Sequence, residues 1–276
     1  MQRAEKRCYA SHDFIQSMNK YLQGRTAIVT GASRRQGIGA AICHKLAQAG
    51  ASICFTYWQA YDRTMPWGAE ETAPQQLQQE LEALGVQASG QEIDLSHPEA
   101  ATQVIQAATN QFDKLSILVN NAAYSVGDGF QALNAEILDA TYAVNLRATA
   151  LLSVEFARCY PGGPGGRIIN LTSGQFQGSM VGEIAYAATK GAIDALTVTL
   201  AAEVASKGIT VNAVNPGPTD SGWLTGELRQ ELLSRFPRGR IGQPEDAARL
   251  VAFLASDEAE WITGQIIHSE GGFRRS

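Results

Sequence analysis

Cysteine and histidine are scarce in this chain of 276 residues, which has four of each. The cysteines are scattered and no two form a C-x-x-C pair, so the sequence suggests neither a zinc site nor a disulfide framework. The histidines also lack the spacing of metal ligands, and we therefore expect no metal. Isolated thiols fit a reducing compartment, which favours a cytoplasmic protein.

An excess of positive charge and long apolar runs are missing as well. The chain has 22 Lys and Arg against 27 Asp and Glu, a formal net charge of −5. This balance opposes a general attraction to nucleic acid or anionic membranes, although it leaves a local basic site open. No segment approaches the roughly 20 apolar residues that span a bilayer, and the N-terminal segment is too polar for a secretory signal. We expect neither a nucleic-acid partner nor a membrane partner.

The N-terminal segment shows no pattern of regular structure. It reads MQRAEKRCYASHDFIQS and precedes Met18, after which the chain leads straight into an apolar strand. We expect residues 1–22 to be a flexible leader, with Met18 as an alternative natural start. The remaining residues, 23–276, are expected to form one domain, because 45% hydrophobic content can supply a sizeable core.

Apolar runs of strand length alternate along the chain with longer segments of helical period. The predicted strands cover 26–30, 52–57, 88–93, 117–120, 167–171, 210–214 and 264–267. The predicted helices cover 38–49, 70–84, 98–111, 134–159, 183–206, 222–235 and 244–255. This alternation is typical of repeated βα units. It predicts an α/β fold with a doubly wound, seven-stranded parallel sheet and helices on both faces. The long connection 58–74 is rich in aromatic residues and should pack on something.

A glycine-rich stretch, T-G-A-S-R-R-Q-G-I-G at 30–39, joins the first predicted strand to the first predicted helix. Gly31, Gly37 and Gly39 permit a sharp turn and a close backbone approach, and the helix N-terminus offers N–H groups to a phosphate. The third glycine of the usual G-x-G-x-x-G pattern is absent. Taken alone, the loop is therefore compatible with a nucleotide site and with a plain glycine turn.

Three polar residues suggest proton transfer. Tyr186 and Lys190 are four residues apart in a predicted helix, so their side chains share a face. A nearby ammonium favours the phenolate and lowers the phenol pKa from about 10. Tyr186 can then exchange a proton with a carbonyl or alcohol oxygen, and Ser173, at the end of a strand, can offer a hydroxyl to the same oxygen. A lone Y-x-x-x-K is common by chance and is more often only a surface pair.

Several further motifs accompany these residues. They are D-L at 94–95, N-N-A-A at 120–123, Asn145, Y-A-A-T-K at 186–190, N-P-G-P-T at 215–219 and I-T-G-Q at 262–265. Together with the glycine loop and Ser173, they follow the order and nearly the spacing of the classical short-chain dehydrogenase/reductases, and residues 24–273 resemble that family. The resemblance implies a single-domain Rossmann fold and hydride transfer with NAD or NADP, without a metal.

The resemblance also implies a role for each catalytic residue. Tyr186 would be the acid in carbonyl reduction and the base in alcohol oxidation, and Ser173 would orient the substrate oxygen. Lys190 would bind the nicotinamide ribose and lower the pKa of Tyr186. Asn145 would hold a water through which protons reach solvent.

Cofactor contacts carry over in the same way. Asp94 and Leu95 resemble the pair that holds the adenine, Asn121 and Ala122 the segment beside its ribose, and the loop at 216–219 the carboxamide site. The full expected set is Gly31, Ser33, Arg34, Arg35, Gly37, Ile38, Gly39, Tyr57, Asp94, Leu95, Asn121, Ala122, Tyr186, Lys190, Pro216, Gly217 and Thr219. Two departures from the family stand out: Ala123 replaces the glycine of N-N-A-G, and the glycine loop is two residues longer than usual.

The choice between NADP(H) and NAD(H) depends on the residues around the adenosine ribose. A site for NAD usually has a carboxylate at the end of the second strand, whereas this strand ends in Tyr57 and Trp58. Arginine can instead bind a 2′-phosphate through two hydrogen bonds. Because Arg34 and Arg35 lie in the adjacent loop, we expect NADP(H) in preference to NAD(H), with the alternative that these arginines only face solvent.

The substrate is expected to be a small carbonyl or alcohol compound. The segment after 219 offers Trp223, Leu224 and Phe236 as an apolar lid, although helix packing explains its leucines equally well. The other wall would comprise Tyr124, Gln175, Phe176, Gln177, Met180 and Glu183. This mixture suits a medium-sized ketone or β-keto ester.

The pattern is closest to the 3-oxoacyl-acyl-carrier-protein reductases, which leaves a carrier-bound substrate open. Lys207 matches one of two basic positions that such reductases use for the carrier, but the second position is Pro164. Arg238 and Arg240 are candidates to compensate for it.

Two other functions and an assembly are also considered. A catalytically idle NADP-binding sensor or scaffold is disfavoured by the intact set of catalytic residues, and a nucleic-acid binder is disfavoured by the acidic balance. The resemblance further implies a homotetramer, or at least a dimer, formed through helices 134–159 and 183–206 and the last strand.

Overall fold

A single parallel sheet of seven strands forms the centre of the computed structural model, which describes residues 20–224 and 226–275. Its strand order is β3-β2-β1-β4-β5-β6-β7. The strands are β1 (Thr26–Val29), β2 (Ser52–Tyr57), β3 (Ala88–Glu92), β4 (Leu115–Asn120), β5 (Gly166–Leu171), β6 (Ile209–Asn215) and β7 (Ile266–His268). Every residue of β1, β4, β5 and β6 is buried, which explains why these strands are nearly continuous apolar runs.

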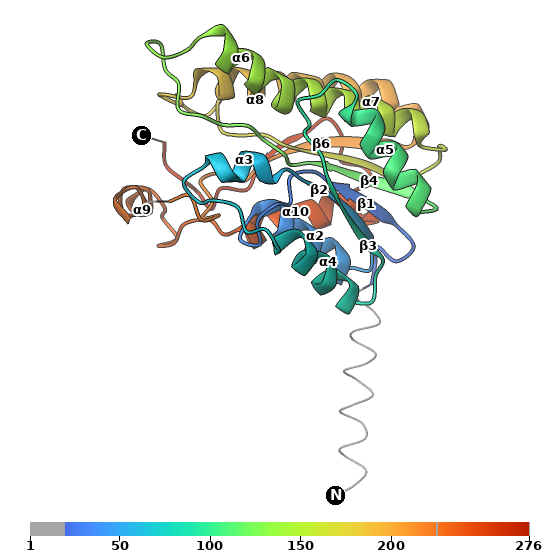
Figure 1. Cartoon of the computed structure of the whole chain (residues 1–276). Coiled ribbons are helices and arrows are strands. Elements are labelled where there is room, and N and C mark those ends of the chain that lie inside the picture. Colours follow the sequence, from blue (N-terminus) through green and yellow to red (C-terminus); the bar gives the residue numbers. More distant parts are fainter. Residues whose placement is uncertain (1–19, 225, 276) are drawn as a thin grey trace, which may run out of the picture.

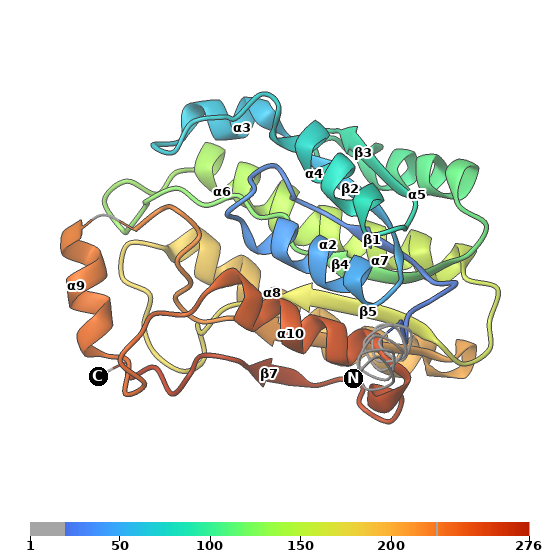
Figure 2. The same cartoon turned by 90° about the horizontal axis from the view of Figure 1, so that it is seen from below.

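Helices cover both faces of this sheet (Figures 1 and 2). One face carries α2 (Ile38–Gln48), α4 (Ala73–Ala83) and α10 (Pro244–Ala255), whose apolar residues form one core cluster with the sheet. The other face carries α5 (Ala100–Gln111), α7 (Thr149–Cys159) and α8 (Ile184–Val204), which form a second cluster. The predicted doubly wound α/β architecture is confirmed.

Three segments differ from the sequence prediction. The region expected as one helix over 134–159 consists of α6 (Ala135–Tyr142), a π-helical turn η1 (Ala143–Ala148) and α7. The aromatic connection 58–74 contains a short helix, α3 (Gln59–Thr64), and α9 (Gly226–Ser234) starts later than expected. Single turns of 3₁₀ helix, η2 (Ala205–Lys207) and η3 (Asp257–Ala259), follow α8 and α10. Short, irregular elements have too few periodic residues to be seen in a pattern.

Leu22, at the end of the expected leader, is part of the core. This side chain is fully buried, and its N–H donates to the carbonyl of Ala49 at 2.8 Å. Leu22 is therefore part of the packed core. The expected leader lies almost wholly outside the described residues, and Met18 with it. Among the helices that are described, none combines the length and apolarity needed to cross a bilayer.

The chain order places a crevice at the carboxyl ends of β1 and β4. From β1 the chain builds outward to β3, then crosses over and builds outward in the other direction from β4 to β7. Adjacent connections therefore leave in opposite directions at these two strands, and such a point is where doubly wound sheets bind their ligands.

Candidate active site

A cavity of about 990 Å³ opens at this crevice, lined by the loops that follow β1 to β6. It brings together most of the residues expected from the sequence. Those that line it are Gly31, Ser33, Arg34, Gly37, Ile38, Gly39, Tyr57, Asp94, Leu95, Asn121, Ala122, Ser173, Tyr186, Pro216, Gly217 and Thr219. Lys190, Asn145 and Arg35 are outside the lining; the first two are buried, and Arg35 is half exposed. Among the described residues, no group of His, Cys, Asp or Glu is arranged to hold a metal ion.

The glycine loop wraps closely against the neighbouring loop. Gly31 has a φ of 73°, and a Cβ there would lie 2.6 Å from the Cα of Ala122. A Cβ on Gly39 would overlap the carbonyl oxygen of Gly31. Gly37 precedes α2 and has no side chain with which to cap it. The backbone at the start of α2 can therefore approach a ligand, as a pyrophosphate site requires.

Four hydrogen bonds join this loop to the end of β4. The Asn121 side chain donates to the carbonyls of Thr30 and Gly31, at 2.8 and 2.9 Å. In return, the Thr30 hydroxyl accepts the backbone N–H groups of Asn121 and Ala122, at 3.0 and 3.1 Å. These bonds fix two of the segments expected to contact the adenosine half of a dinucleotide.

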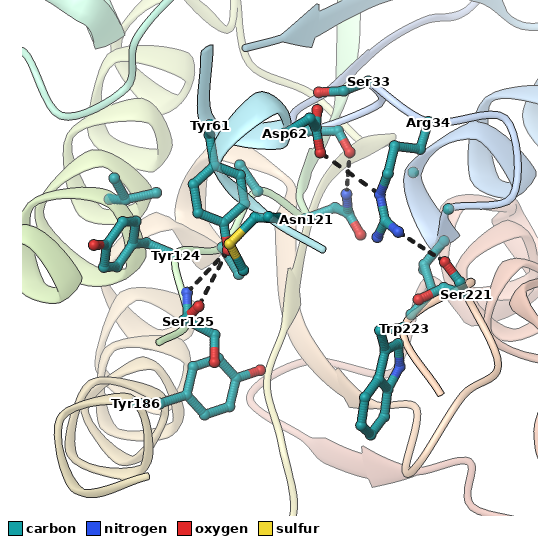
Figure 3. A pocket seen from close by; sticks show the side chains of 18 of the residues that line it. Ser33, Arg34, Tyr61, Asp62, Asn121, Tyr124, Ser125, Tyr186, Ser221 and Trp223 are labelled. Carbon is teal, nitrogen blue, oxygen red and sulfur yellow. Dashed lines mark hydrogen bonds and ion pairs between the residues drawn. The ribbon is translucent and has the colours of Figure 1, made fainter. Parts of the chain in front are cut away.

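The two loop arginines have different surroundings. Arg34 lines the cavity, donates to the carbonyl of Ser221 at 2.8 Å, and lies 3.7 Å from the Asp62 carboxylate (Figure 3). Its guanidinium also lies 4.3 Å from the centre of the Trp67 ring. Arg35 is half exposed and pairs with Glu80 of α4, outside the cavity lining. Arg34 is therefore the one of the two that faces the site.

The aromatic connection after β2 packs over the cavity, as its composition predicted. Tyr61 of α3 bonds through its hydroxyl to the backbone of Ser125, and its ring lies 5.5 Å from that of Tyr124. The Trp67 indole donates to Asp62 at 2.9 Å. Tyr61, Asp62 and Trp67 were absent from the expected site residues. The aromatic residues at 58–67 are the sequence feature that could have indicated these residues, but the sequence does not show which of the side chains point into the cavity.

Tyr186 and Lys190 share one face of α8, as predicted. The Lys190 ammonium lies 5.5 Å from the centre of the Tyr186 ring and donates to the carbonyl of Leu171 at 2.7 Å. Tyr186 points into the cavity (Figure 3). Ser173 also lines this cavity. Tyr186, on α8, thus meets Ser173, which follows β5, across the loop that joins these two elements.

The expected lowering of the Tyr186 pKa by Lys190 is not seen. Burial raises the pKa of Tyr186, and the nearby Glu183 carboxylate raises it further, while the nearby Ser173 side chain acts in the opposite direction. Burial also lowers the pKa of Lys190 to about 8, against the effect of Asp194. The ammonium is turned toward Leu171, so desolvation dominates. Tyr186 is therefore a neutral phenol at neutral pH, the form that donates a proton.

Asn145 lies in η1 and is almost fully buried. Its side chain accepts from the N–H of Tyr124 at 2.7 Å and donates to the carbonyl of that residue at 3.0 Å. It also donates to the hydroxyl of Thr189 at 3.2 Å. Asn145 thus connects the loop after β4 to α8. π-helical turns occur frequently at functional sites.

The expected substrate walls are only partly as predicted. Tyr124, Met180, Glu183 and Trp223 line the cavity. Gln175 instead bonds to Asp194 at 2.6 Å, Phe176 is exposed, and Phe236 packs on Phe273. Gln177 and Leu224 are likewise outside the lining, whereas Leu228, Leu232 and Arg275 belong to it. Alternation within a loop does not reveal which side chains face a cavity.

Of the residues considered for a carrier protein, Lys207 and Pro164 lie at the end of the sheet opposite the cavity. Lys207 precedes β6 and Pro164 precedes β5, so both lie at the amino ends of strands whose carboxyl ends form the cavity. The Lys207 ammonium donates to the carbonyl of Ala157. Arg240 forms an ion pair with Asp246 at 2.6 Å. Within one chain, Lys207 therefore does not lie at the cavity entrance.

Sequence comparisons relate this chain to known oxidoreductases. Residues 31–274 match the family model described as Enoyl-(Acyl carrier protein) reductase. The uncharacterized oxidoreductase YjdA of Bacillus subtilis is 53% identical over 255 residues, which are 92% of this chain and 98% of that protein. The 3-oxoacyl-[acyl-carrier-protein] reductase FabG of Vibrio cholerae is 36% identical, covering 91% of this chain and 98% of that protein.

Solved structures give the same relationship. A short chain dehydrogenase from Burkholderia cenocepacia, crystallised in complex with NADP, superposes with a TM-score of 0.82 and 35% identity. The match covers 91% of this chain and 98% of that one. The similarity therefore extends over nearly the whole of both chains.

Proposed function

This chain belongs to the classical short-chain dehydrogenase/reductases, a family of oxidoreductases, and we propose that it interconverts a carbonyl and a secondary alcohol with NADP(H). One observation carries the proposal: Ser173 and Tyr186 line the same cavity as the glycine loop. A side chain that can donate a proton and a loop that can bind a dinucleotide thus line the same cavity.

The residues present fit a nicotinamide dinucleotide. Side chains are excluded at Gly31 and Gly39, where a Cβ would meet backbone, and this leaves room for a pyrophosphate at the start of α2. Asp94 and Leu95 would hold the adenine, Asn121 and Ala122 the adjacent ribose, and Lys190 the other ribose. The loop of Pro216, Gly217 and Thr219 would hold the carboxamide. The nicotinamide, when bound, supplies or accepts the hydride.

The protein's own side chains handle the proton. In the direction of reduction, the Tyr186 hydroxyl donates its proton to the carbonyl oxygen, and its raised pKa keeps that proton available at neutral pH. The Ser173 hydroxyl donates a hydrogen bond to the same oxygen and orients it. We assign Asn145 a water-holding role in the return of a proton to Tyr186. In the direction of oxidation, Tyr186 must first lose its proton, which the same burial opposes.

Three features support a preference for NADP(H) over NAD(H). β2 ends at Tyr57 without a carboxylate, and Arg34 lies in the cavity wall beside it. The Burkholderia relative was crystallised with NADP.

The proposed substrate is a medium-sized ketone or a β-keto ester, and a 3-oxoacyl thioester is included because of the named reductase among the relatives. Tyr124, Met180 and Trp223 supply a largely apolar wall for such a compound. We further propose a homotetramer in the cytoplasm; these two statements rest on the family resemblance and on the isolated thiols.

Tyr186→Phe tests the proposal directly. We expect wild-type protein to consume NADPH with members of a panel of ketones, keto esters and 3-oxoacyl thioesters, and the variant to lose at least about a hundredfold in kcat, because general acid catalysis contributes that much or more. NADPH binding, followed by fluorescence, should be retained.

Two outcomes would count against it. Near wild-type turnover by Tyr186→Phe would remove the assigned acid. Tight NADPH binding by the wild-type protein with no turnover across the panel would favour the idle sensor or scaffold.

A further inference from the structure

Arg275 lines the cavity, although it belongs to none of the sequence motifs described above. Its guanidinium forms an ion pair with Glu270 and donates to the side-chain oxygen of Gln177 at 3.1 Å. The Glu270 side chain is only 7% exposed, so the arginine neutralises a buried carboxylate. The pair is therefore a fixed element of the wall and not a mobile surface contact.

The guanidinium is pressed against the residue that follows Ser173. A Cβ added to Gly174 would overlap Nη2 and Cζ of Arg275 and would lie 2.6 Å from Nη1. A Cβ added to Gly178 would lie 3.0 Å from Cδ of the same side chain. Both glycines belong to the loop that carries the Ser173 hydroxyl into the cavity. The Arg275 side chain thus packs against this loop at both Gly174 and Gly178.

The same side chain reaches two other loops. The Gln177 oxygen that accepts from Arg275 also accepts from Asn215 at 3.0 Å, and Asn215 in turn accepts from the N–H of Gly217. A Cβ on Gly217 would lie 2.9 Å from Cβ of Glu270, the ion-pair partner. Arg275 therefore connects the loops after β5, β6 and β7, which carry Ser173 and the expected carboxamide site.

The backbone around Arg275 is itself anchored. The Phe273 ring lies 4.9 Å from the centre of the Phe236 ring. The backbone N–H of Phe273 donates to the carbonyl of Glu270 at 3.1 Å. The N–H of Arg274 donates to the carbonyl of Arg235, next to α9, at 3.0 Å. These contacts hold the segment in place and aim the Arg275 side chain inward.

We propose that Arg275 is a positioning residue that fixes the Ser173 loop against the loops after β6 and β7. The inference rests on the proposed function, since it concerns how Ser173 is oriented toward a carbonyl oxygen. Arg275 acts through Gly174 and Gln177 and needs no contact with substrate. A misplaced catalytic group costs about ten- to a hundredfold in rate, so a loosened loop should be visible in kcat.

The chain offers a matched control in the adjacent residue. Arg274 carries the same charge, and its side chain is exposed. We expect Arg275→Ala to lower kcat for NADPH-dependent reduction on the order of tenfold, with a smaller change in the Kd for NADPH, whereas Arg274→Ala should change neither. Equal kcat values for the two variants, measured below the Tm of each, would overturn the inference.

A double-mutant cycle separates positioning of Ser173 from general loosening of the fold. If Arg275 acts through Ser173, then adding Arg275→Ala to Ser173→Ala should lower kcat by less than about twofold. The same factor in both backgrounds would overturn the inference. Failure of the proposed function is distinct from this, because it would appear as absent turnover, or as an active Tyr186→Phe, before any arginine is changed.

Gly174→Ala provides a second test that does not depend on removing the arginine. The new methyl group should displace the guanidinium and lower kcat, but in the Arg275→Ala background this clash is gone and the loss should be smaller. Equal losses in both backgrounds would show that the guanidinium does not cover Gly174, and would contradict the inference.

Discussion

At the scale of single residues, the site contains charged side chains that are buried and interact with specific partners. Arg34 is largely buried, and burial lowers its pKa, but Ser221 and Trp67 compensate part of the lost hydration. Lys190 is more deeply buried and donates to Leu171. Such groups are expensive to bury, which is why they are seldom retained without a ligand or a reaction to serve.

Arg34 is the residue that we expect to decide between the two nicotinamide cofactors. In Arg34→Gln, the loss of bidentate hydrogen bonds to a 2′-phosphate should lower kcat/KM for NADPH by about tenfold to a hundredfold, with little change for NADH. Arg35→Gln is the matched control, because Arg35 pairs with Glu80 outside the cavity, and its effect should be smaller. Steady-state kinetics with both cofactors provide the measurement. An equal loss with NADH, or a larger effect at Arg35, would contradict this assignment.

Lys190 should leave a signature in the pH dependence of stability. Because burial lowers its pKa from 10.5 to about 8, the folded chain binds fewer protons than the unfolded chain between these values. The wild-type protein should therefore gain unfolding free energy from this group as pH rises from about 8 toward 10.5, and lose it again as pH falls. Lys190→Met has no such titration. Relative to that variant, the wild type should gain about 2 kcal/mol between about pH 7.5 and pH 9.5.

Denaturant unfolding of both proteins at these two pH values measures the effect. Lys114→Met removes an exposed lysine instead and serves as the control, which should show no comparable change. A stability difference between wild type and Lys190→Met that stays constant with pH would contradict the lowered pKa.

At the scale of elements, the regular parts of the fold were predictable and the irregular ones were not. The seven strands agree with the prediction to within a few residues. β1, β4, β5 and β6 are fully buried and therefore largely apolar, whereas β3 and β7 are only partly buried and were indicated by their place in the βα alternation. The helix expected over 134–159 is interrupted by the π-helical turn η1. A single wider turn changes the spacing of apolar residues too little to be recognised in the sequence. α3 is only six residues long and its sequence has no clear period.

The site follows the same division. Motifs indicated the residues on loops fixed by the strands, such as Ser173 after β5 and Gly31 after β1. They did not indicate Tyr61 or Arg275, which reach the cavity from α3 and from the segment after β7 through packing between distant parts of the chain. Nor did they give the direction of the Tyr186 pKa, because the motif shows a neighbouring cation and says nothing of burial.

One element shows how local capping positions the chemistry. α8 begins at Ile184, without a side-chain cap of its own at Glu183. Asp128, from the loop after β4, accepts from the N–H groups of Ile184 and Ala185 at 2.6 and 2.7 Å. A carboxylate at this position also suits the positive end of the helix dipole. The first turn, which holds Tyr186, is thereby tied to the loop that forms the opposite wall.

At the scale of the whole molecule, two separate surfaces expose large apolar side chains. One lies on α7 and α8, which pack side by side, and includes Leu151 and Val198. The other lies on the α10 side and includes Phe253 and Trp261, the latter 98% exposed. Single exposed apolar residues are ordinary, whereas exposed apolar residues that lie together are typical of contacts between proteins. Two independent surfaces are what a tetramer with twofold axes uses.

We therefore expect the purified protein to have a mass near four times 29.6 kDa in light scattering coupled to gel filtration. Leu151→Glu combined with Val198→Glu should reduce this mass to that of a dimer, because burying unpaired carboxylates in an interface costs several kcal/mol. Trp261→Glu should have the corresponding effect on the other surface. A wild-type protein that remains a single chain at micromolar concentration would contradict the assembly, and the exposed side chains would then require another partner.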